Sequence, residues 1–217
     1  MFFFFIAAVV LLVSYFFGCI NGSVMTSHFI IKDDVRKHGS GNAGLTNFYR
    51  TYGAKYALLV IAIDMGKTVV AVLIGGFMFD YLFQDWTLGV LLAGLGCELG
   101  HMFPVFFGFR GGKGILSGGA LSFFLDWRIA AVCWGLFLIL WLLTRYVSLG
   151  SVIGTLSVPV TACLVFGWNW PYLILCAILA GLIIYCHREN IKRLFKGTES
   201  KFKWHVNPIP GADDAGK

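Results

Sequence analysis

The chain has 217 residues, of which 58% are hydrophobic and only 13% are charged. This composition is too apolar for a soluble domain of ordinary length and predicts a polytopic membrane protein. The formal net charge of +6 arises from basic residues near the ends of apolar runs, where it suits a membrane surface, so we expect no nucleic-acid partner. Residues 1–203 are predicted to form a single membrane domain, followed by a polar tail at 204–217.

Seven apolar runs predict an all-α integral membrane fold. In chain order they cover residues 2–25, 56–79, 87–100, 114–125, 129–144, 148–166 and 171–186. A helix needs about 20 apolar residues to cross the hydrocarbon region of a bilayer, so the runs at 87–100 and 114–125 are short. They are predicted to be longer than drawn, strongly tilted, or a pair of re-entrant half-helices. The first run lacks a basic start, so we expect a retained span rather than a cleavable signal peptide.

Outside these runs, the Lys and Arg residues fall on one side of the arrangement, and Arg128 alone falls on the other. Because basic residues are retained in cytoplasmic loops, this bias predicts an N-terminus outside and a C-terminus in the cytoplasm. Seven spans, or five with a re-entrant pair, give the same sidedness. The six cysteines show no C-x-x-C spacing, so neither a metal site nor a disulfide framework is expected.

A segment rich in Gly, Ser and Asn, residues 38–50, follows the first run on the predicted cytoplasmic side. It contains Ser40, Asn42, Thr46 and Asn47 and ends at Arg50. Glycines allow close backbone approach, and successive N–H groups in such a turn form an anion-binding nest. A plain polar turn is the alternative.

A second glycine-rich cluster contains Gly111, Gly112 and Lys113, with His101 upstream. A cation among glycines suits a phosphate group. The G-x-x-x-x-G-K-[ST] spacing of a nucleotide-binding P-loop is missing, so nucleotide binding of that kind is not expected.

Three further polar groups border or enter the apolar runs. Ser148 begins the run at 148–166, where it either lines a site or bonds to its own helix backbone. His187 and Asn190 are three residues apart and share a helical face at the inner end of the last run, as a catalytic pair or as an ordinary polar helix end. Lys67 lies three residues after Asp64 inside a run, where the two charges are predicted to pair with each other or with the site.

Taken together, these segments resemble the bacterial acyl-phosphate:glycerol-3-phosphate acyltransferases, an integral-membrane family of the PlsY type. The family's three cytoplasmic motifs are similar to residues 38–50, 100–114 and 145–151, and its C-terminal signature is similar to residues 187–199. The sequence departs from the pattern after Gly114, where it reads Ile-Leu-Ser in place of the usual small residue and threonine, and at Thr68, where glycine is usual.

The resemblance implies that a fatty acyl group passes from acyl phosphate to the 1-hydroxyl of sn-glycerol 3-phosphate, giving lysophosphatidic acid and phosphate at a bacterial cytoplasmic membrane. The donor is already activated, so the enzyme has to orient the hydroxyl, stabilise the oxyanion and neutralise the leaving phosphate. This chemistry needs neither a metal nor another cofactor. The expected partners are the two substrates and the lipid bilayer.

The resemblance also implies roles for individual residues. The predicted catalytic residues are His187, Asn190, Ser40 and Asn42. The predicted substrate-binding residues are Arg50, Thr46, Asn47, Gly111, Gly112, Lys113, Ser148, His101 and Lys67. Either His187 or a substrate phosphate removes the hydroxyl proton, and an acyl-enzyme on Ser40 is a third option.

Two other functions are compatible with these residues. A small transporter or channel for a phosphorylated metabolite also uses basic and amide groups at helix ends. The two halves of the sequence have no convincing similarity, however, and the outer ends of the runs have few polar groups, which favours a site closed on that side. The third possibility is a catalytically inactive, lipid-binding relative.

Overall fold

The computed structural model describes residues 1–204 and 209. Within this part of the chain the only regular elements are helices, which confirms the predicted fold class. The longer helices are α1 (Phe2–Gly18), α4 (Ala57–Phe83), α5 (Trp86–Met102), α6 (Ile115–Leu125), α7 (Trp127–Thr144), α8 (Val147–Phe166) and α9 (Trp170–Cys186). The shorter ones are α2 (Gly22–Met25), η1 (Thr26–Ile31), η2 (Val35–Lys37), α3 (Leu45–Tyr52), η3 (Val105–Phe107) and α10 (Arg188–Phe195). Most of the predicted tail at 204–217 lies outside the described residues.

Five helices in the described part of the chain are long and apolar enough to cross a membrane, and the bent pair α9 and α10 brings the number to six. The run predicted at 87–100 belongs to α5 and, continued to Phe107, makes a 22-residue span. This length makes it a full span and not a half-helix. Glu98 and His101 interrupt the apolar pattern, but the helix continues through both residues. The run at 114–125 does form a short helix, α6, with 11 residues.

The run predicted at 2–25 is not one continuous helix. It ends at Gly18, and α2 restarts at Gly22 after Asn21, whose side chain accepts a hydrogen bond from the Val24 N–H. In the gap, the ammonium of Lys67 in α4 donates to the carbonyl oxygens of Gly18 and Ile20 at 3.0 and 2.7 Å. A buried cation thus satisfies backbone groups that the helix break leaves open.

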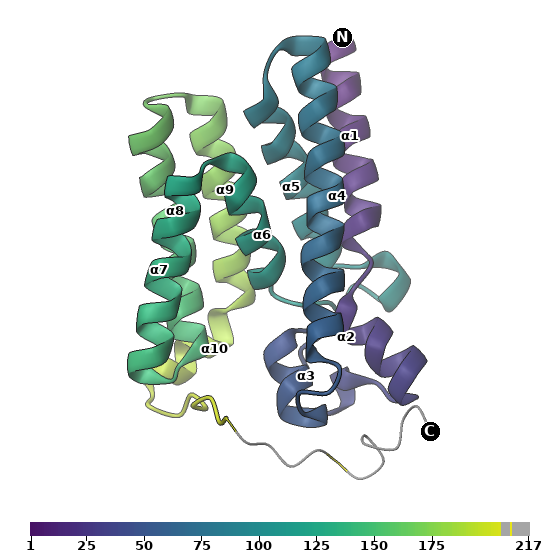
Figure 1. Ribbon diagram of the computed structural model, residues 1–217, viewed down its shortest axis with the longest axis vertical. Coiled ribbons are helices and arrows are strands. Elements are labelled where there is room, and N and C mark those ends of the chain that lie inside the picture. Colours follow the sequence, from purple (N-terminus) through teal and green to yellow (C-terminus); the bar gives the residue numbers. More distant parts are fainter. Residues whose placement is uncertain (205–208, 210–217) are drawn as a thin grey trace.

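The long helices form two groups with α6 between them (Figure 1). One group contains α1, α4 and α5, and the other contains α7, α8 and α9. The α1 and α5 backbones touch at glycines: a Cβ on Gly100 would lie 2.0 Å from the Tyr15 carbonyl oxygen. Such close packing of small residues is typical of helices inside membranes. The short elements α2, α3 and α10 lie at one end of the molecule, opposite the N-terminus.

The outer surface of the helices is apolar, as a bilayer requires. Leu143 and Leu164 are 79% and 81% exposed, and Phe77 and Val160 are also well exposed. In water such side chains would form a large unfavourable patch. In a membrane they face lipid tails, which confirms the expectation of a multi-pass membrane protein.

Candidate active site

A cavity of about 500 Å³ lies between the two helix groups. Its apolar wall is formed by α4, α6 and α7, through side chains such as Met65, Leu116 and Trp141. Its polar part contains ten of the residues predicted from the sequence: Ser40, Asn42, Thr46, Asn47, Arg50, His101, Lys113, Ser148, His187 and Asn190. These residues are up to about 150 positions apart in sequence, and the fold brings them into one site. Asp64, Arg193 and Glu199 also line it.

The loop before α3 is organised by one side chain, Asn47. Its amide oxygen accepts the Ser40 N–H at 2.9 Å, and its amide nitrogen lies within 3.1 Å of three backbone carbonyl oxygens, including that of Asn42. Asn47 is buried, so these bonds hold a loop that would otherwise be free to move. The loop turns at Gly39 and Gly41, whose φ angles are +55° and +70°. Ser40 and Asn42 therefore have fixed positions on the cavity wall.

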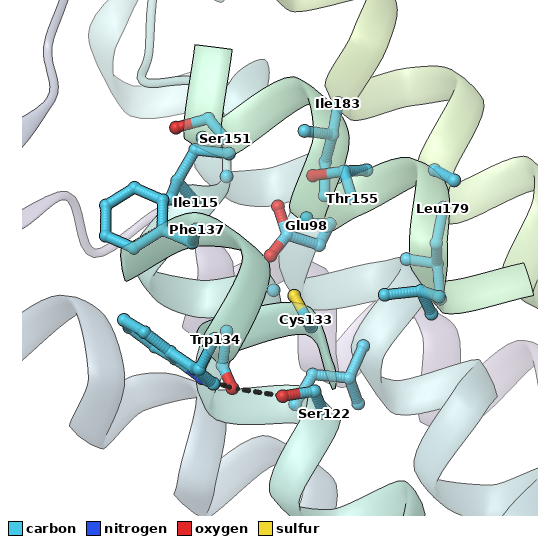
Figure 2. A pocket seen from close by; sticks show the side chains of 18 of the residues that line it. Glu98, Ile115, Ser122, Cys133, Trp134, Phe137, Ser151, Thr155, Leu179 and Ile183 are labelled. Atoms are coloured by element: carbon cyan, nitrogen blue, oxygen red, sulfur yellow. Dashed lines mark hydrogen bonds between the residues drawn. The ribbon is translucent and has the colours of Figure 1, made fainter. Parts of the chain in front are cut away.

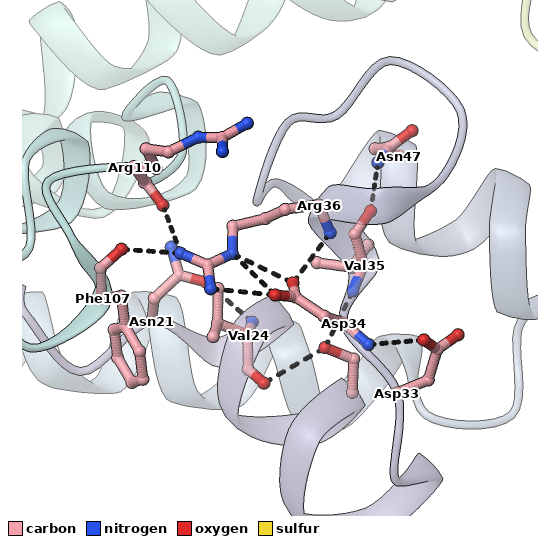
Figure 3. Close-up of polar contacts among 10 residues, drawn as sticks. Asn21, Val24, Asp33, Asp34, Val35, Arg36, Asn47, Phe107 and Arg110 are labelled. Atoms are coloured by element: carbon pink, nitrogen blue, oxygen red, sulfur yellow. Dashed lines mark hydrogen bonds and ion pairs between the residues drawn. The ribbon is translucent and has the colours of Figure 1, made fainter.

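This loop is tied to the second glycine-rich loop by Arg36, as Figure 3 shows. The guanidinium pairs with Asp34 at 2.9 Å and donates to the carbonyl oxygens of Phe107 and Arg110 at 2.7 and 3.3 Å. The Asn21 amide adds a bond of 3.1 Å to the Ala43 carbonyl oxygen. The two loops that carry the predicted phosphate-binding residues are thus held as one unit.

The residues beneath the second loop explain its glycines. Gly112 donates its N–H to the His101 carbonyl oxygen at 3.0 Å, and a Cβ on Gly112 would lie 2.1 Å from the His101 ring nitrogen Nε2. A Cβ on Gly111 would lie 2.0 Å from the same carbonyl oxygen. Both glycines therefore serve close packing against α5, and this packing sets the position of Lys113.

Lys67 belongs to a buried cluster below the cavity. Its ammonium lies 3.1 Å from the Asp64 carboxylate and 2.8 Å from Nδ1 of His101. The predicted Asp64–Lys67 pair is therefore confirmed. Lys67, Gly111 and Gly112 are not among the residues that line the cavity, whereas His101 is. Direct contact of those three residues with a substrate stays a prediction, and their observed role is to support the wall.

One continuous set of hydrogen bonds joins the second loop to the C-terminal end of the bundle. Lys113 donates to the Asn190 amide oxygen. The Asn190 amide nitrogen and the Ser148 hydroxyl both donate to Oε1 of Glu199 at 2.7 Å, and Arg193 donates to Oε2 at 2.7 Å. The sequence places Glu199 and Arg193 in the segment 187–199 but gives neither of them a predicted role in the site. The spacing of His187, Asn190 and Arg193, three residues apart each time, is the signal that places all three on one helical face.

The cavity has an excess of positive charge. Arg50, Lys113 and Arg193 are cations, and Glu199 offsets one of them. Burial, with the nearby Arg193, lowers the pKa of Lys113 to about 8. Burial also lowers the pKa of Arg50, although Glu199 opposes this effect. Burial acts to raise the pKa of Glu199, but hydrogen bonds from Asn190, Ser148 and Arg193 outweigh it and the pKa is lowered. The site is suited to an anion that carries more than one negative charge.

His187 lies at the break between α9 and α10, where the chain bends by 61°. Its Nδ1 is 2.8 Å from the Ile183 carbonyl oxygen, and the residue is only 4% exposed. A carbonyl oxygen only accepts, so Nδ1 carries the hydrogen and Nε2 is the basic nitrogen. This is the tautomer that a general base needs.

A side chamber of about 50 Å³ adjoins the main cavity and shares Ile115, Trp134 and Ser151 with it. Figure 2 shows the Glu98 side chain in this mostly apolar chamber. Glu98 is 1% exposed, and neither carboxyl oxygen has a hydrogen-bond partner among the described residues. The sequence does not mark Glu98 as a functional residue, because it is the single charged residue within the apolar run at 87–100.

The helical fold, the cationic polar end and the apolar wall define a multi-pass membrane protein whose cavity is suited to an anion beside an apolar group. The model of the glycerol-3-phosphate acyltransferase family matches residues 8–197. Glycerol-3-phosphate acyltransferases of Thermoanaerobacter pseudethanolicus and Finegoldia magna are 38% and 39% identical, over 90% and 88% of this chain and 95% and 93% of theirs. The chain belongs to the glycerol-3-phosphate acyltransferase family, and it is an acyltransferase of the membrane.

Two solved structures have the same fold. Both are crystal structures of PlsY (YgiH), an integral membrane glycerol 3-phosphate acyltransferase, one in its glycerol 3-phosphate form and one in its lysophosphatidic acid form. Each has a TM-score of 0.78 and covers 91% of this chain. This chain covers 96% and 95% of the two structures, with 36% and 35% sequence identity. The resemblance seen in the sequence is thereby confirmed.

Proposed function

We propose that the protein transfers a fatty acyl group from acyl phosphate to the 1-hydroxyl of sn-glycerol 3-phosphate, and that it works in a bacterial cytoplasmic membrane. The observation that carries this proposal is the cavity, which joins Arg50, Lys113 and Arg193 to an apolar wall on α4, α6 and α7. Both substrates carry a phosphate, and the donor also carries a chain that needs an apolar surface. The named relatives support the acceptor, and the two-part cavity supports a lipid-like donor.

The transfer follows from the geometry of the polar end. The glycerol hydroxyl oxygen attacks the acyl carbonyl carbon, the bond from that carbon to the phosphate oxygen breaks, and inorganic phosphate leaves with the electron pair. Ser40, Asn42 and Lys113 are positioned to hold the donor phosphate, and Arg50, Ser148 and Asn190 to hold glycerol 3-phosphate. Nε2 of His187 accepts the hydroxyl proton. Cations and amides set in place before the reaction stabilise the charge that develops on the carbonyl and phosphate oxygens.

The direct test is lysophosphatidic acid formation from palmitoyl phosphate and glycerol 3-phosphate by the purified protein in detergent. We expect turnover that needs both substrates and falls about 10²-fold or more in Lys113→Ala, because a buried anion site loses a cation. Lys192→Ala is the matched control, since that lysine is 65% exposed and pairs with Glu189. Palmitoyl coenzyme A in place of palmitoyl phosphate tests the choice of donor.

Two results would reject the proposal. Folded protein that turns over no acyl phosphate of any chain length, yet binds lysophosphatidic acid, would be an inactive lipid-binding relative. Uptake of glycerol 3-phosphate into proteoliposomes without acylation would mean a transporter.

A further inference from the structure

Glu199 lies after α10, on a segment outside the helical bundle, yet its side chain is only 5% exposed. The carboxylate points into the polar end of the cavity and accepts three hydrogen bonds. The function proposed above assigns it no contact with either substrate. A buried carboxylate among residues predicted to bind phosphate requires an explanation, because it competes with the substrates for the same donors.

The first effect of Glu199 is to orient Asn190. A side-chain amide can point its oxygen or its nitrogen toward a given partner. Because Oε1 of Glu199 accepts from the Asn190 nitrogen at 2.7 Å, the amide oxygen must point the other way, toward Lys113. The Lys113 ammonium is thus held by an acceptor whose direction is set by Glu199.

The second effect concerns the Ser148 hydroxyl. Its single hydrogen is donated to Oε1 of Glu199 at 2.7 Å. Its lone pairs therefore remain available to a substrate, so Ser148 acts toward the cavity as an acceptor. An acceptor suits the hydroxyl of glycerol 3-phosphate better than its phosphate.

The segment that follows Glu199 holds the carboxylate in place. The Ser200 carbonyl oxygen accepts from Arg50 at 3.0 Å, and the Phe202 N–H donates to the Arg145 carbonyl oxygen at 2.7 Å. The Phe202 ring stacks on Tyr49 at 5.3 Å and meets Trp141 edge-on at 5.3 Å. These contacts join α3 to the end of α7 across the cavity and fix Glu199 between them.

The charges around Lys113 come from several elements. Arg50 in α3 and Arg193 in α10 disfavour its charged form, as burial does. Glu199 favours the charged form, and so does Cys186 at the end of α9 to a smaller degree, while His187 faces Lys113 from the α9–α10 break. Glu199 is therefore the main counter-charge of the ammonium.

We propose that Glu199 is a positioning residue for the transfer reaction: through Asn190 it directs the Lys113 ammonium into the cavity, and it supplies the counter-charge that the ammonium needs. The inference rests on the function proposed above. A positioning role differs from a purely structural role in one respect. The charge of Glu199 then determines the pH range in which the Lys113 ammonium is available to the reaction.

The test compares Glu199→Gln with Glu199→Asp by the pH dependence of kcat/KM for palmitoyl phosphate, measured as lysophosphatidic acid formed. For the wild-type protein we expect the alkaline limb of the pH profile, where kcat/KM falls as Lys113 loses its proton, to lie near pH 8. In Glu199→Gln this limb should move to lower pH by about one unit, because an opposite charge close to a cation is worth one unit or more. Glu199→Asp keeps the charge, so its limb should stay in place while KM for palmitoyl phosphate rises.

The matched control is Glu189→Gln, the same chemical change on a 58% exposed side chain that pairs with Lys192. Activity of wild type and of this control establishes the transfer reaction independently of Glu199. If folded Glu199→Gln loses activity equally at every pH, or loses none, the inference is wrong. If Glu199→Gln does not fold, Glu199→Asp decides, since an unchanged KM in that variant also overturns the inference.

Discussion

Lys113 is the residue through which pH acts most directly on the site. Its pKa of about 8 means that the free enzyme carries the ammonium below pH 8 and loses it as the pH rises above that value. The cavity then has one cation fewer for a phosphate, so kcat/KM for palmitoyl phosphate should fall above pH 8. Arginine stays charged throughout this range, so Lys113→Arg should lose the alkaline limb even where its activity is low. The measurement is the initial rate of lysophosphatidic acid formation from pH 6 to 10, because spontaneous hydrolysis of the donor releases phosphate but does not form this product.

His187 has the hydrogen-bond arrangement of a general base, because Nδ1 is engaged by the Ile183 carbonyl oxygen at 2.8 Å. We expect His187→Ala to lower kcat by about 10²–10⁴-fold with a modest change in KM for glycerol 3-phosphate. Steady-state kinetics with glycerol 3-phosphate varied at saturating palmitoyl phosphate measure both quantities. A rise in KM with kcat preserved would instead make His187 a binding residue and leave proton removal to a substrate phosphate.

The sequence predicts residues that line the cavity where polar groups are concentrated in short segments. Ser40, Asn42 and Asn47 share one glycine-rich turn, and Lys113 stands among glycines, so local composition reveals them. Glu199 has no such neighbours, and its partners Ser148 and Asn190 become adjacent to it only when the chain folds. Asn47 was predicted to bind substrate, and its hydrogen bonds indicate that it also organises the loop.

At the scale of elements, α5 carries the unpartnered Glu98 against the side chamber. A buried carboxyl without hydrogen bonds costs about 1–3 kcal/mol, and an apolar side chain of similar shape removes that cost. We therefore expect Glu98→Met to raise the midpoint of thermal unfolding in detergent by about 2–12 °C, since 1 kcal/mol corresponds to roughly 2–4 °C in a chain of this size. The measurement is unfolding followed by fluorescence. Glu98→Gln is the control, because it keeps the polar group and should bring no such gain. A lower midpoint in Glu98→Met would mean that the carboxyl makes a stabilising contact.

The limits of helices are harder to predict than their existence. His101, which lines the cavity, directly follows the predicted run at 87–100 and makes that run look shorter than α5, which continues to Met102. The break after Gly18 is hard to place for a different reason. Cys19 and Ile20 continue the apolar run, and the local turn signal is the short Asn21-Gly22 pair, while Lys67, distant in sequence, caps the open carbonyl groups. Tertiary contacts decide both limits, so a reading of local pattern misses them.

For the whole molecule, the sidedness of the membrane fold is the property that the function depends on most. The site lies at the end of the bundle that carries α3 and α10, opposite the N-terminus. That end also carries Arg36, Arg50, Lys113, Arg145 and Arg193. At the α6–α7 turn, by contrast, Arg128 is paired with Asp126 at 2.9 Å. Because basic loops are retained in the cytoplasm, the site is predicted to face the compartment that supplies glycerol 3-phosphate.

Reporter fusions in bacterial cells test this orientation. A green fluorescent protein fused after Lys217 should fluoresce, because this reporter folds in the cytoplasm, where the C-terminus is predicted to lie. Alkaline phosphatase inserted after Gln84, in the turn between α4 and α5, should be active, because that turn is predicted to lie outside. Alkaline phosphatase inserted after Lys37 is the control and should be inactive. The opposite pattern would put Lys113 and Arg50 outside, away from their predicted substrates, and would contradict both the orientation and the proposed reaction. Replacing the exposed Lys192 and Lys196 by glutamine should leave the pattern unchanged, because the basic residues of the other loops on that side still fix the orientation.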